Sequence, residues 1–268
     1  MEGYYYYSIA SGSKGNAGLF ITPDANILID MGISYKYLCE SLKKHEIEKI
    51  DIALITHEHS DHTKGLQMLA KKTNIPIYIT KKSYNALKTE IIDTNINFFE
   101  PNEQFYIDDL DILSFRTPHD SVESVGFNIR HKEMIFSYVT DLGFMPNSVL
   151  ETIKTSDFLV LESNYDKLML ETGPYPYTLK QRILSSEGHL SNYESAKCVA
   201  NLLESGVSQI VLAHLSENNN THKCVRDEIE NTLKFYKITA KIGEDIHIAP
   251  IKNDYPLIKI TKEIKCLV

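Results

Sequence analysis

The sequence predicts a layered α/β fold with a functional site at one edge of its sheets. Short apolar segments rich in β-branched residues alternate with helix-type segments, and several of the apolar segments end in His, Asp or Glu. No low-complexity linker interrupts this pattern. Because a sheet holds the residues at its strand ends rigidly, strand ends are the usual place for a site in such folds. We expect one domain over residues 1–252 and a short tail over residues 253–268.

The first half of the chain is expected to contain most of the strands. Aromatic and branched residues between turn residues predict strands at 4–9, 18–22, 26–30, 51–56, 75–79, 95–99, 104–107, 110–115, 124–130 and 133–138. Helix-type patterns predict helices at 34–44, 63–72 and 82–88.

In the second half, helices and strands alternate. Helices are expected at 145–154, 178–185, 192–205 and 223–236, and strands at 157–161 and 208–213. Two short segments, 238–241 and 245–249, are expected to end the domain.

Composition is that of an ordinary globular protein and limits its partners. Hydrophobic residues make up 43% of the chain and charged residues 24%. No apolar run approaches a membrane span, and the first residues have neither the basic start nor the apolar core of a signal peptide. The four cysteines show no framework spacing, which favours a reducing, cytoplasmic location. A net charge of −8 argues against non-specific coating of nucleic acid, but metal ions could supply positive charge locally in a nuclease.

The run Thr-His-Glu-His-Ser-Asp-His at residues 56–62 places four potential metal ligands between an apolar strand and a helix-type segment. Residues i and i+2 of an extended segment point the same way, so His57 and His59 can share one metal. Asp61 and His62, past the bend, can face a second. Imidazole and carboxylate ligands suit zinc, manganese or iron rather than copper(I). The alternative is a solvated histidine-rich turn, but loops rarely concentrate so many ligands by accident.

Other ligand-type residues follow other apolar strands. They are His119, Asp141, Glu162 and His214. Each is a weak signal alone, but together they could supply the remaining residues of a two-metal site that begins with the histidine run. Asp141 could bridge two metals held about 3.5–4 Å apart. Asp30, at the end of an earlier strand, could support a ligand from behind, or could be a turn or helix-cap residue.

Contacts to a substrate are less sharply indicated. The run Ser-Gly-Ser-Lys-Gly-Asn at 11–16, with Ser13, Lys14 and Asn16, could cradle a phosphate with its backbone N–H groups or form a plain tight hairpin. Candidates elsewhere are two cations, Lys180 and Arg182, and two tyrosines, Tyr175 and Tyr177. Exposed cations are usually just solvated. The tyrosines could stack on a terminal base or simply pack against the protein.

With these residues together, the pattern His-x-His-x-Asp-His resembles that of the metallo-β-lactamase superfamily. The resemblance implies an αβ/βα sandwich of four layers, with metals at one edge. It implies one metal on His57, His59 and His119, a second on Asp61, His62 and His214, and Asp141 as the bridge. His59 stands where the iron–flavin members have Glu, which points away from that redox class.

Two further motifs resemble the RNase Z-like phosphodiesterases of this superfamily. One is Leu-Val-Leu-Glu-Ser-Asn, which contains Glu162 and Asn164, and the other is Gly-His-Leu-Ser-Asn, which contains His189. In those relatives the Glu orients the His, which protonates the leaving oxygen, since a carboxylate partner keeps imidazole charged and aimed. The alternative is that Ser191 or Asn192 simply caps a helix and His189 is incidental.

From residue 11 to residue 219 the chain resembles the YycJ/WalJ family of single-domain bacterial proteins. The shared motifs are the runs at 11–16, 161–164, 175–183, 188–192 and 212–219. The resemblance implies a metal-dependent exonuclease that acts on DNA from the 5′ end. Asn164 is a further candidate substrate contact, while Tyr165 stands where family members tend to have His. The chain leaves no room for a β-CASP cap and shows no Gly/Pro-rich arm for tRNA, so RNA maturation is less favoured.

We therefore predict a two-metal phosphodiesterase acting on nucleic acid, with DNA as substrate and 5′-to-3′ exonuclease action. The cofactors would be zinc or manganese ions, with iron also compatible. Metal coordination lowers the pKa of water from 15.7 to about 7, so a nucleophile is present at neutral pH. The expected catalytic residues are Asp61, Asp141, Glu162 and His189. The alternatives are a thioester or lactone hydrolase, an RNA-processing nuclease, or a non-enzymatic protein that keeps the metal site; neither a membrane nor a protein partner is indicated.

Overall fold

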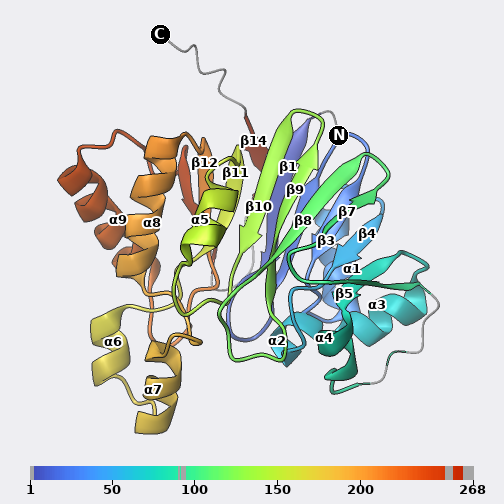
Figure 1. Ribbon diagram of the computed structural model, residues 1–268, viewed down its shortest axis with the longest axis horizontal. Coiled ribbons are helices and arrows are strands. Elements are labelled where there is room, and N and C mark those ends of the chain that lie inside the picture. Colours follow the sequence, from blue (N-terminus) through green and yellow to red (C-terminus); the bar gives the residue numbers. More distant parts are fainter. Residues whose placement is uncertain (1–2, 90, 92–94, 251–255, 262–268) are drawn as a thin grey trace.

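The computed structural model describes residues 3–89, 91, 95–250 and 256–261. Two β-sheets pack face to face, and helices cover the outer face of each sheet (Figure 1). This arrangement confirms the predicted four-layer α/β sandwich.

The first sheet has the strand order β14-β1-β2-β3-β4-β5-β6. Its strands are β14 (Ile258–Ile260), β1 (Tyr4–Ala10), β2 (Ala17–Ile21), β3 (Asn26–Ile29), β4 (Ile52–Leu54), β5 (Ile77–Thr80) and β6 (Ile96–Phe99). Strands β3 to β6 run parallel to one another. The carboxyl ends of these strands therefore share one edge.

The second sheet has the strand order β13-β12-β11-β10-β9-β8-β7. Its strands are β13 (Ile246–Ile248), β12 (Gln209–Ala213), β11 (Phe158–Glu162), β10 (Met134–Val139), β9 (Val125–His131), β8 (Leu110–Arg116) and β7 (Gln104–Ile107). Strands β10 to β13 are parallel. Every residue of β10 and β11 is buried, as expected for strands with the other sheet on one face and helices on the other.

The helices of the described residues are mostly short and lie outside the sheets. They are α1 (Tyr35–Lys44), α2 (Ser60–Thr63), α3 (Leu66–Lys72), α4 (Lys81–Asn85), α5 (Asn147–Ile153), α6 (Lys167–Thr172), α7 (Tyr177–Leu184), α8 (Asn192–Ser205) and α9 (His222–Tyr236). Ser34, Ser191 and Thr221 accept hydrogen bonds from backbone N–H groups of the helices that they precede. Gly206 ends α8 with a φ of 107°, which glycine adopts most readily.

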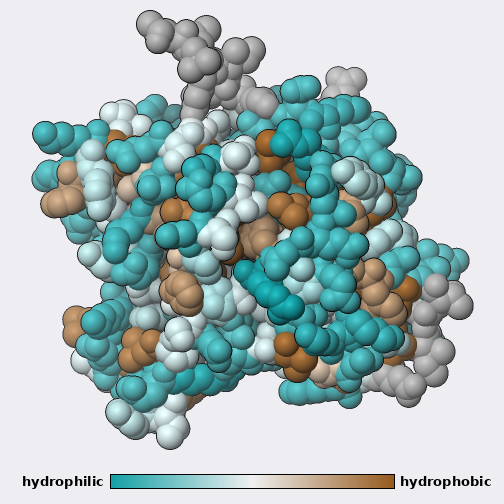
Figure 2. All heavy atoms as spheres, in the orientation of Figure 1, coloured by the Kyte–Doolittle hydropathy of each residue, from teal (hydrophilic) through white to brown (hydrophobic). Residues whose placement is uncertain are grey.

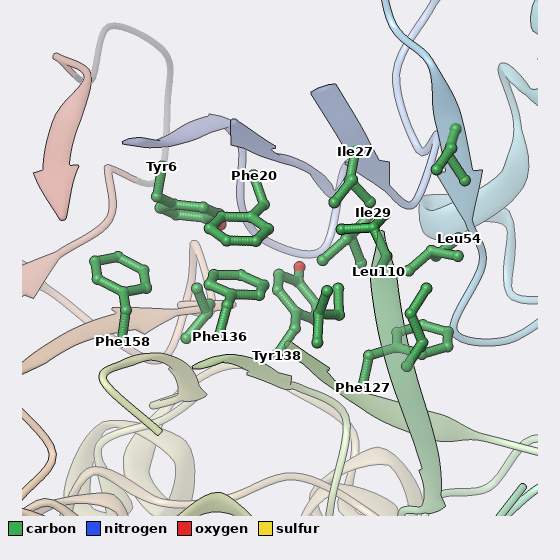
Figure 3. Close-up of a cluster of buried hydrophobic side chains, with 14 of the residues drawn as sticks. Tyr6, Phe20, Ile27, Ile29, Leu54, Leu110, Phe127, Phe136, Tyr138 and Phe158 are labelled. Atoms are coloured by element: carbon green, nitrogen blue, oxygen red, sulfur yellow. The ribbon is translucent and has the colours of Figure 1, made fainter. Parts of the chain in front are cut away.

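The hydrophobic core between the sheets is rich in aromatic rings. Phe20 of the first sheet stacks on Phe136 of the second, with ring centroids 4.2 Å apart, and Tyr6 and Phe158 pack beside them (Figure 3). Two further clusters fill the space between each sheet and its helices. The two sheets are thus held in a fixed relation, so the ends of their strands meet at a defined place.

One expectation about the fold needs correction. Residues 256–261 belong to the segment 253–268 that we expected to be a tail, but β14 pairs with β1 because Ile258 and Ile260 bury on the sheet. Of the two segments expected to end the domain, 245–249 contains β13, and helix α6 was not predicted from the sequence. Among the described residues, no helix is both long and apolar enough to cross a membrane.

Candidate metal centre

The histidine run lies where β4 passes into α2, as predicted. His57 is fully buried and His59 is half-buried. Their ligand atoms and that of His119, which follows β8, all lie within 4.8 Å of one another. His119 Nε2 is 3.3 Å from His59 Nδ1. These three imidazoles from two loops form the first predicted ligand group.

The second predicted group is also brought together. Asp61, His62 and His214, which follows β12, have ligand atoms within 4.8 Å of one another. The Asp61 Oδ2 atom is 3.5 Å from His62 Nε2 and 3.8 Å from His214 Nε2. Strand ends of both sheets therefore contribute to one centre.

Asp141, after β10, stands between the two groups. Its Oδ2 atom is 3.3 Å from His62 Nε2, and its Oδ1 atom is 3.6 Å from His119 Nε2. One oxygen thus faces each group, which is the position that a bridging carboxylate needs. The bridging role itself stays a prediction.

The donor set fits divalent metal ions. Three of its buried atoms have no hydrogen-bond partner: His57 Nε2, His214 Nε2 and Asp141 Oδ2. Buried polar atoms without partners are costly, and metal coordination satisfies such atoms. Two groups of nitrogen and oxygen donors, with a carboxylate between them, therefore suit two ions of the zinc or manganese type.

The electrostatics of the centre favour positive charge. Burial, followed by the neighbouring imidazoles, lowers the pKa of His57, and burial lowers that of His119, which keeps both rings in the neutral form that binds metals. Burial opposes protonation of His62 and His214 as well, but nearby carboxylates outweigh it and raise the pKa of His62 well above its usual value and that of His214 to about 10. Asp141 contributes to both effects. A site that attracts protons so strongly also attracts metal cations in their place.

Asp30 lies behind the predicted ligand His62, and its supporting role there stays a prediction. Its Oδ2 atom lies 2.7 Å from His62 Nδ1, and its Oδ1 atom accepts a 2.8 Å hydrogen bond from Thr56 N. Asp30 is fully buried, so these contacts fix the ring of His62. Asp30, Asp141 and His214 also share left-handed backbone conformations, with φ of 64°, 58° and 58°. Such strain in non-glycine residues gathers at functional sites.

Glu162, at the end of β11, joins several parts of the centre. Its Oε1 atom lies 2.6 Å from His214 Nδ1 and 2.9 Å from His189 Nδ1. Its Oε2 atom accepts a 2.8 Å hydrogen bond from Leu190 N. The expected pairing of Glu162 with His189 is present in the geometry. Glu162 is fully buried, however, so it positions other groups rather than touching a substrate.

The loop at 11–16 joins β1 to β2 and packs against the ligands. Asn16 is 2% exposed, and its Nδ2 atom lies 3.2 Å from Asp61 Oδ2 and 3.0 Å from His62 Nε2. The Ser11 hydroxyl accepts a 2.6 Å hydrogen bond from His214 N. Asn16 therefore orients ligand residues, whereas we expected it to contact a substrate. A Cβ on Gly32 would lie 1.6 Å from Asp61 O, so only glycine fits where the two loops meet.

A pocket of about 230 Å³ opens onto the centre. Of the predicted substrate contacts, Ser13, Asn164 and Arg182 line it, but Lys14 and Lys180 do not. Lys14 Nζ is 2.5 Å from Glu217 Oε2, and Lys180 Nζ donates to Glu171 O at 2.8 Å. The Asn164 side chain is also engaged, since its Nδ2 atom donates to His214 O at 2.8 Å.

Sequence reasoning missed an amide network behind His214. Asn220 Nδ2 donates to Ser163 O and Asn164 O, both at 2.9 Å, and Asn192 Nδ2 donates to Asn220 Oδ1 at 2.9 Å. This network holds the residues after β11 against the start of α8. The run of three asparagines at 218–220, just before α9, is the signal that could have indicated it.

Comparison with known proteins agrees with this geometry. Residues 25–215 match the family model described as "Beta-lactamase superfamily domain". The chain belongs to the metallo-β-lactamase superfamily. It is 34% identical over 237 residues to "Exodeoxyribonuclease YycJ" of Bacillus anthracis, which covers 87% of this chain and 90% of that protein. It is 32% identical to "Exodeoxyribonuclease WalJ" of Streptococcus pneumoniae, over 86% of this chain and 88% of that one.

A solved structure of the superfamily confirms the fold. The metallo-β-lactamase fold protein YhfI from Bacillus subtilis superposes with a TM-score of 0.67 at 19% identity, over 92% of this chain and 96% of that chain. The predicted membership of the metallo-β-lactamase superfamily and the resemblance to YycJ and WalJ are thus confirmed. As a member of this superfamily, the chain is a metal-dependent hydrolase.

Proposed function

We propose that this hydrolase is a two-metal-dependent phosphodiesterase that shortens DNA from the 5′ end. Two relatives that match the chain over most of their length carry the name exodeoxyribonuclease. The seven predicted ligand residues form two groups with Asp141 between them, and five of them, His59, Asp61, His119, Asp141 and His214, line one pocket. The free thiols of Cys39, Cys198 and Cys224 suit the cytoplasm, where we place this activity.

In the proposed reaction, the metal ligands, His189 and Glu162 would have different roles. When bound, the two metal ions would supply a nucleophile from water at neutral pH and neutralise charge on the phosphate. His189 lines the pocket and would donate a proton to the departing oxygen. Its Nδ1 atom faces Glu162, which leaves Nε2 as the nitrogen for that transfer.

The observation that carries the proposal is the contact between His189 and Glu162 beside the metal ligands. His189 Nδ1 is 2.9 Å from Glu162 Oε1 and 3.8 Å from Asp141 Oδ1. An alkoxide leaving group needs a proton, and a carboxylate-held imidazole next to the metals is placed to provide it. A thioester or lactone hydrolase with the same ligands would leave this pair without a clear task.

The test uses metal-stripped protein and a DNA duplex with a 5′-phosphate and a 3′ label. Products are separated on a gel after incubation with manganese, zinc or no metal, beside the Asp141→Ala variant. Shortening that requires metal and is lost in the variant is the expected result. If duplex DNA, single-stranded DNA and RNA all stay intact with a full metal complement, the nuclease proposal fails, and thioesters and lactones become the substrates to test.

A further inference from the structure

The pocket has one wall that the metal chemistry does not explain. Helices α6 and α7 form a hairpin that projects from the body of the molecule below the second sheet (Figure 1). Tyr175, Leu179 and Ile183, which we call the α7 wall, line the pocket together with five of the predicted metal ligands. Leu179 and Ile183 are four residues apart, so they lie on one face of α7.

The α7 wall is the face of a small separate core. Tyr165, Leu170 and Ile183 form a buried cluster, and Tyr175 and Leu179 pack against it while remaining half-buried. The inner atoms of Tyr175 and Leu179 thus contact the hairpin, and their outer atoms face the pocket. Leu168 and Leu184, also in the hairpin, are exposed, and Figure 2 shows hydrophobic surface in this region.

Contacts at both ends hold the wall in place across the pocket. The Tyr175 hydroxyl accepts a 2.9 Å hydrogen bond from Asn218 Nδ2, close to His214 in the chain. At the other end, Arg182 pairs with Asp120 through both its Nε and its Nη2 atoms, the latter at 3.0 Å. Asp120 follows His119. The wall is therefore tied to two of the loops that carry predicted metal ligands, those with His119 and His214, and its distance from these ligands is set before a substrate arrives.

The charges around the pocket limit how a nucleotide could be recognised. Asp61, Asp120 and Asp141 line the pocket. Its described lining residues include one arginine, Arg182, and no lysine, and Arg182 is already paired with Asp120. Beyond the metals, the pocket thus offers little positive charge for neighbouring phosphates. Its remaining free surface toward the hairpin is aromatic and aliphatic, which suits a base or sugar.

We propose that the nucleoside attached to the reacting phosphate packs on Tyr175 and Leu179 of the α7 wall. This inference rests on the proposed function and names the part of the substrate that the wall recognises. The pocket of about 230 Å³ is smaller than the roughly 300–1,000 Å³ of ordinary ligand pockets, so it suits one terminal nucleotide rather than a continuous strand. If the α7 wall closes the side of the pocket away from the metal ligands, a strand cannot pass through the pocket, and cleavage is restricted to strand ends.

The experiment compares two small phosphodiesters with the same leaving group. Thymidine 3′-(p-nitrophenyl phosphate) carries a nucleoside that is joined to the phosphate through its 3′ oxygen, as the 5′-terminal nucleotide of DNA is, and methyl p-nitrophenyl phosphate carries none. We expect Tyr175→Ala and Leu179→Ala to lower kcat/KM for the nucleoside ester about 5- to 150-fold, the range for loss of a base–aromatic contact. Hydrolysis of the methyl ester should stay within about twofold, because it depends on the metals and leaving group alone.

Two variants serve as controls. Tyr177→Ala removes a tyrosine of the same hairpin that is 74% exposed and does not line the pocket, so it should leave both rates unchanged. Tyr175→Phe keeps the ring and should retain the preference for the nucleoside ester. Equal losses on both esters in Tyr175→Ala, or no loss on either, would overturn the α7 wall as a nucleoside site. If the wild-type protein cleaves neither ester nor DNA, the proposed phosphodiesterase function itself has failed.

Discussion

Glu162 and His214 are joined by a short contact, with 2.6 Å between Oε1 and Nδ1. The same carboxylate oxygen is 2.9 Å from His189 Nδ1, so one buried side chain orients both a predicted metal ligand and the predicted proton donor. Burial raises the pKa of the Glu162 carboxyl, but the two histidines outweigh this and lower it below its usual value. Glu162 is therefore an anion that contacts both groups, so it would couple metal binding to proton transfer in the proposed function.

Replacing Glu162 by Gln tests this coupling. The variant keeps the size of the side chain but loses the charge that holds both imidazoles. We expect metal affinity and kcat each to fall about 10- to 100-fold, as for other residues that hold metal ligands in place. Metal titration by calorimetry and rates at saturating metal provide the two readouts. A loss in kcat with unchanged metal affinity would mean that Glu162 serves His189 alone.

His189→Ala should separate proton transfer from metal binding. The predicted loss is about 10²- to 10⁴-fold in kcat on DNA, the usual size for a general acid, with the bound metal content unchanged. Metal analysis of the purified variant and single-turnover rates check both parts. His222→Ala, at the start of α9, is the control and should behave like wild type. Full activity of His189→Ala would exclude the relay of Glu162 and His189.

Removal of metal should lower the thermal stability of the protein. A ligand present at 100 times its Kd stabilises the folded state by about 2.7 kcal/mol, and the clustered donors are arranged only in that state. We expect a chelator to lower the Tm of wild type, and added zinc or manganese to restore it. Asp141→Ala should respond much less, because it lacks the carboxylate between the two ligand groups. An identical Tm with and without chelator would contradict the metal centre.

Glu123 should contribute a pH-dependent part of the stability. Its side chain is 1% exposed, and Oε1 accepts hydrogen bonds from Arg116 Nη2 at 2.8 Å and from Lys82 Nζ at 3.1 Å. Burial raises the pKa of Glu123, but these two cations outweigh burial and lower it. The folded state then binds a proton less readily than the unfolded chain, so the stabilisation is complete above the unfolded pKa of about 4.3 and is lost as pH falls through the folded pKa.

The corresponding measurement compares the Tm of wild type and Glu123→Gln between neutral pH and about pH 3. The difference should be largest near neutrality and should shrink in acid. Exposed Glu48→Gln serves as the reference and should follow wild type throughout. A difference that stays constant across the range would show that the charge of Glu123 is not what stabilises the fold.

The clustering of the candidate metal ligands was largely predictable, because the residues concerned are marked by local patterns in the sequence. The histidine run lies within seven residues, and the other ligands each follow a recognisable apolar strand. Parallel strands place their carboxyl ends at one edge, so the convergence of Asp141 and His214 follows from the parallel strands β10 and β12. His119 reaches the same edge because β8 is antiparallel to β9, which is in turn antiparallel to β10. For Asp30 the sequence left two interpretations open, and its contacts with His62 and Thr56, which favour a supporting role, depend on the folded structure.

The roles that could not be predicted depend on contacts between distant parts of the chain. Asn16 looked like a phosphate contact, but it meets Asp61 and His62 across 45 and 46 residues. Lys180 looked free, but it donates to a carbonyl at the end of α6, a six-residue helix too short to show a clear period. Three-residue strands such as β14 are likewise too short to show a clear alternation of apolar and polar residues.

Strand β14 protects the molecule from pairing with other molecules at the edge of the first sheet. It covers the edge of β1, where Tyr4, Tyr5 and Tyr6 pair with its three residues, and it presents the exposed Lys259 on its own outer side. Without β14, the unpaired N–H and C=O groups of a tyrosine-rich strand would form a template for another chain. A protein ending at residue 255 is therefore expected to aggregate, even though every ligand of its metal centre is intact.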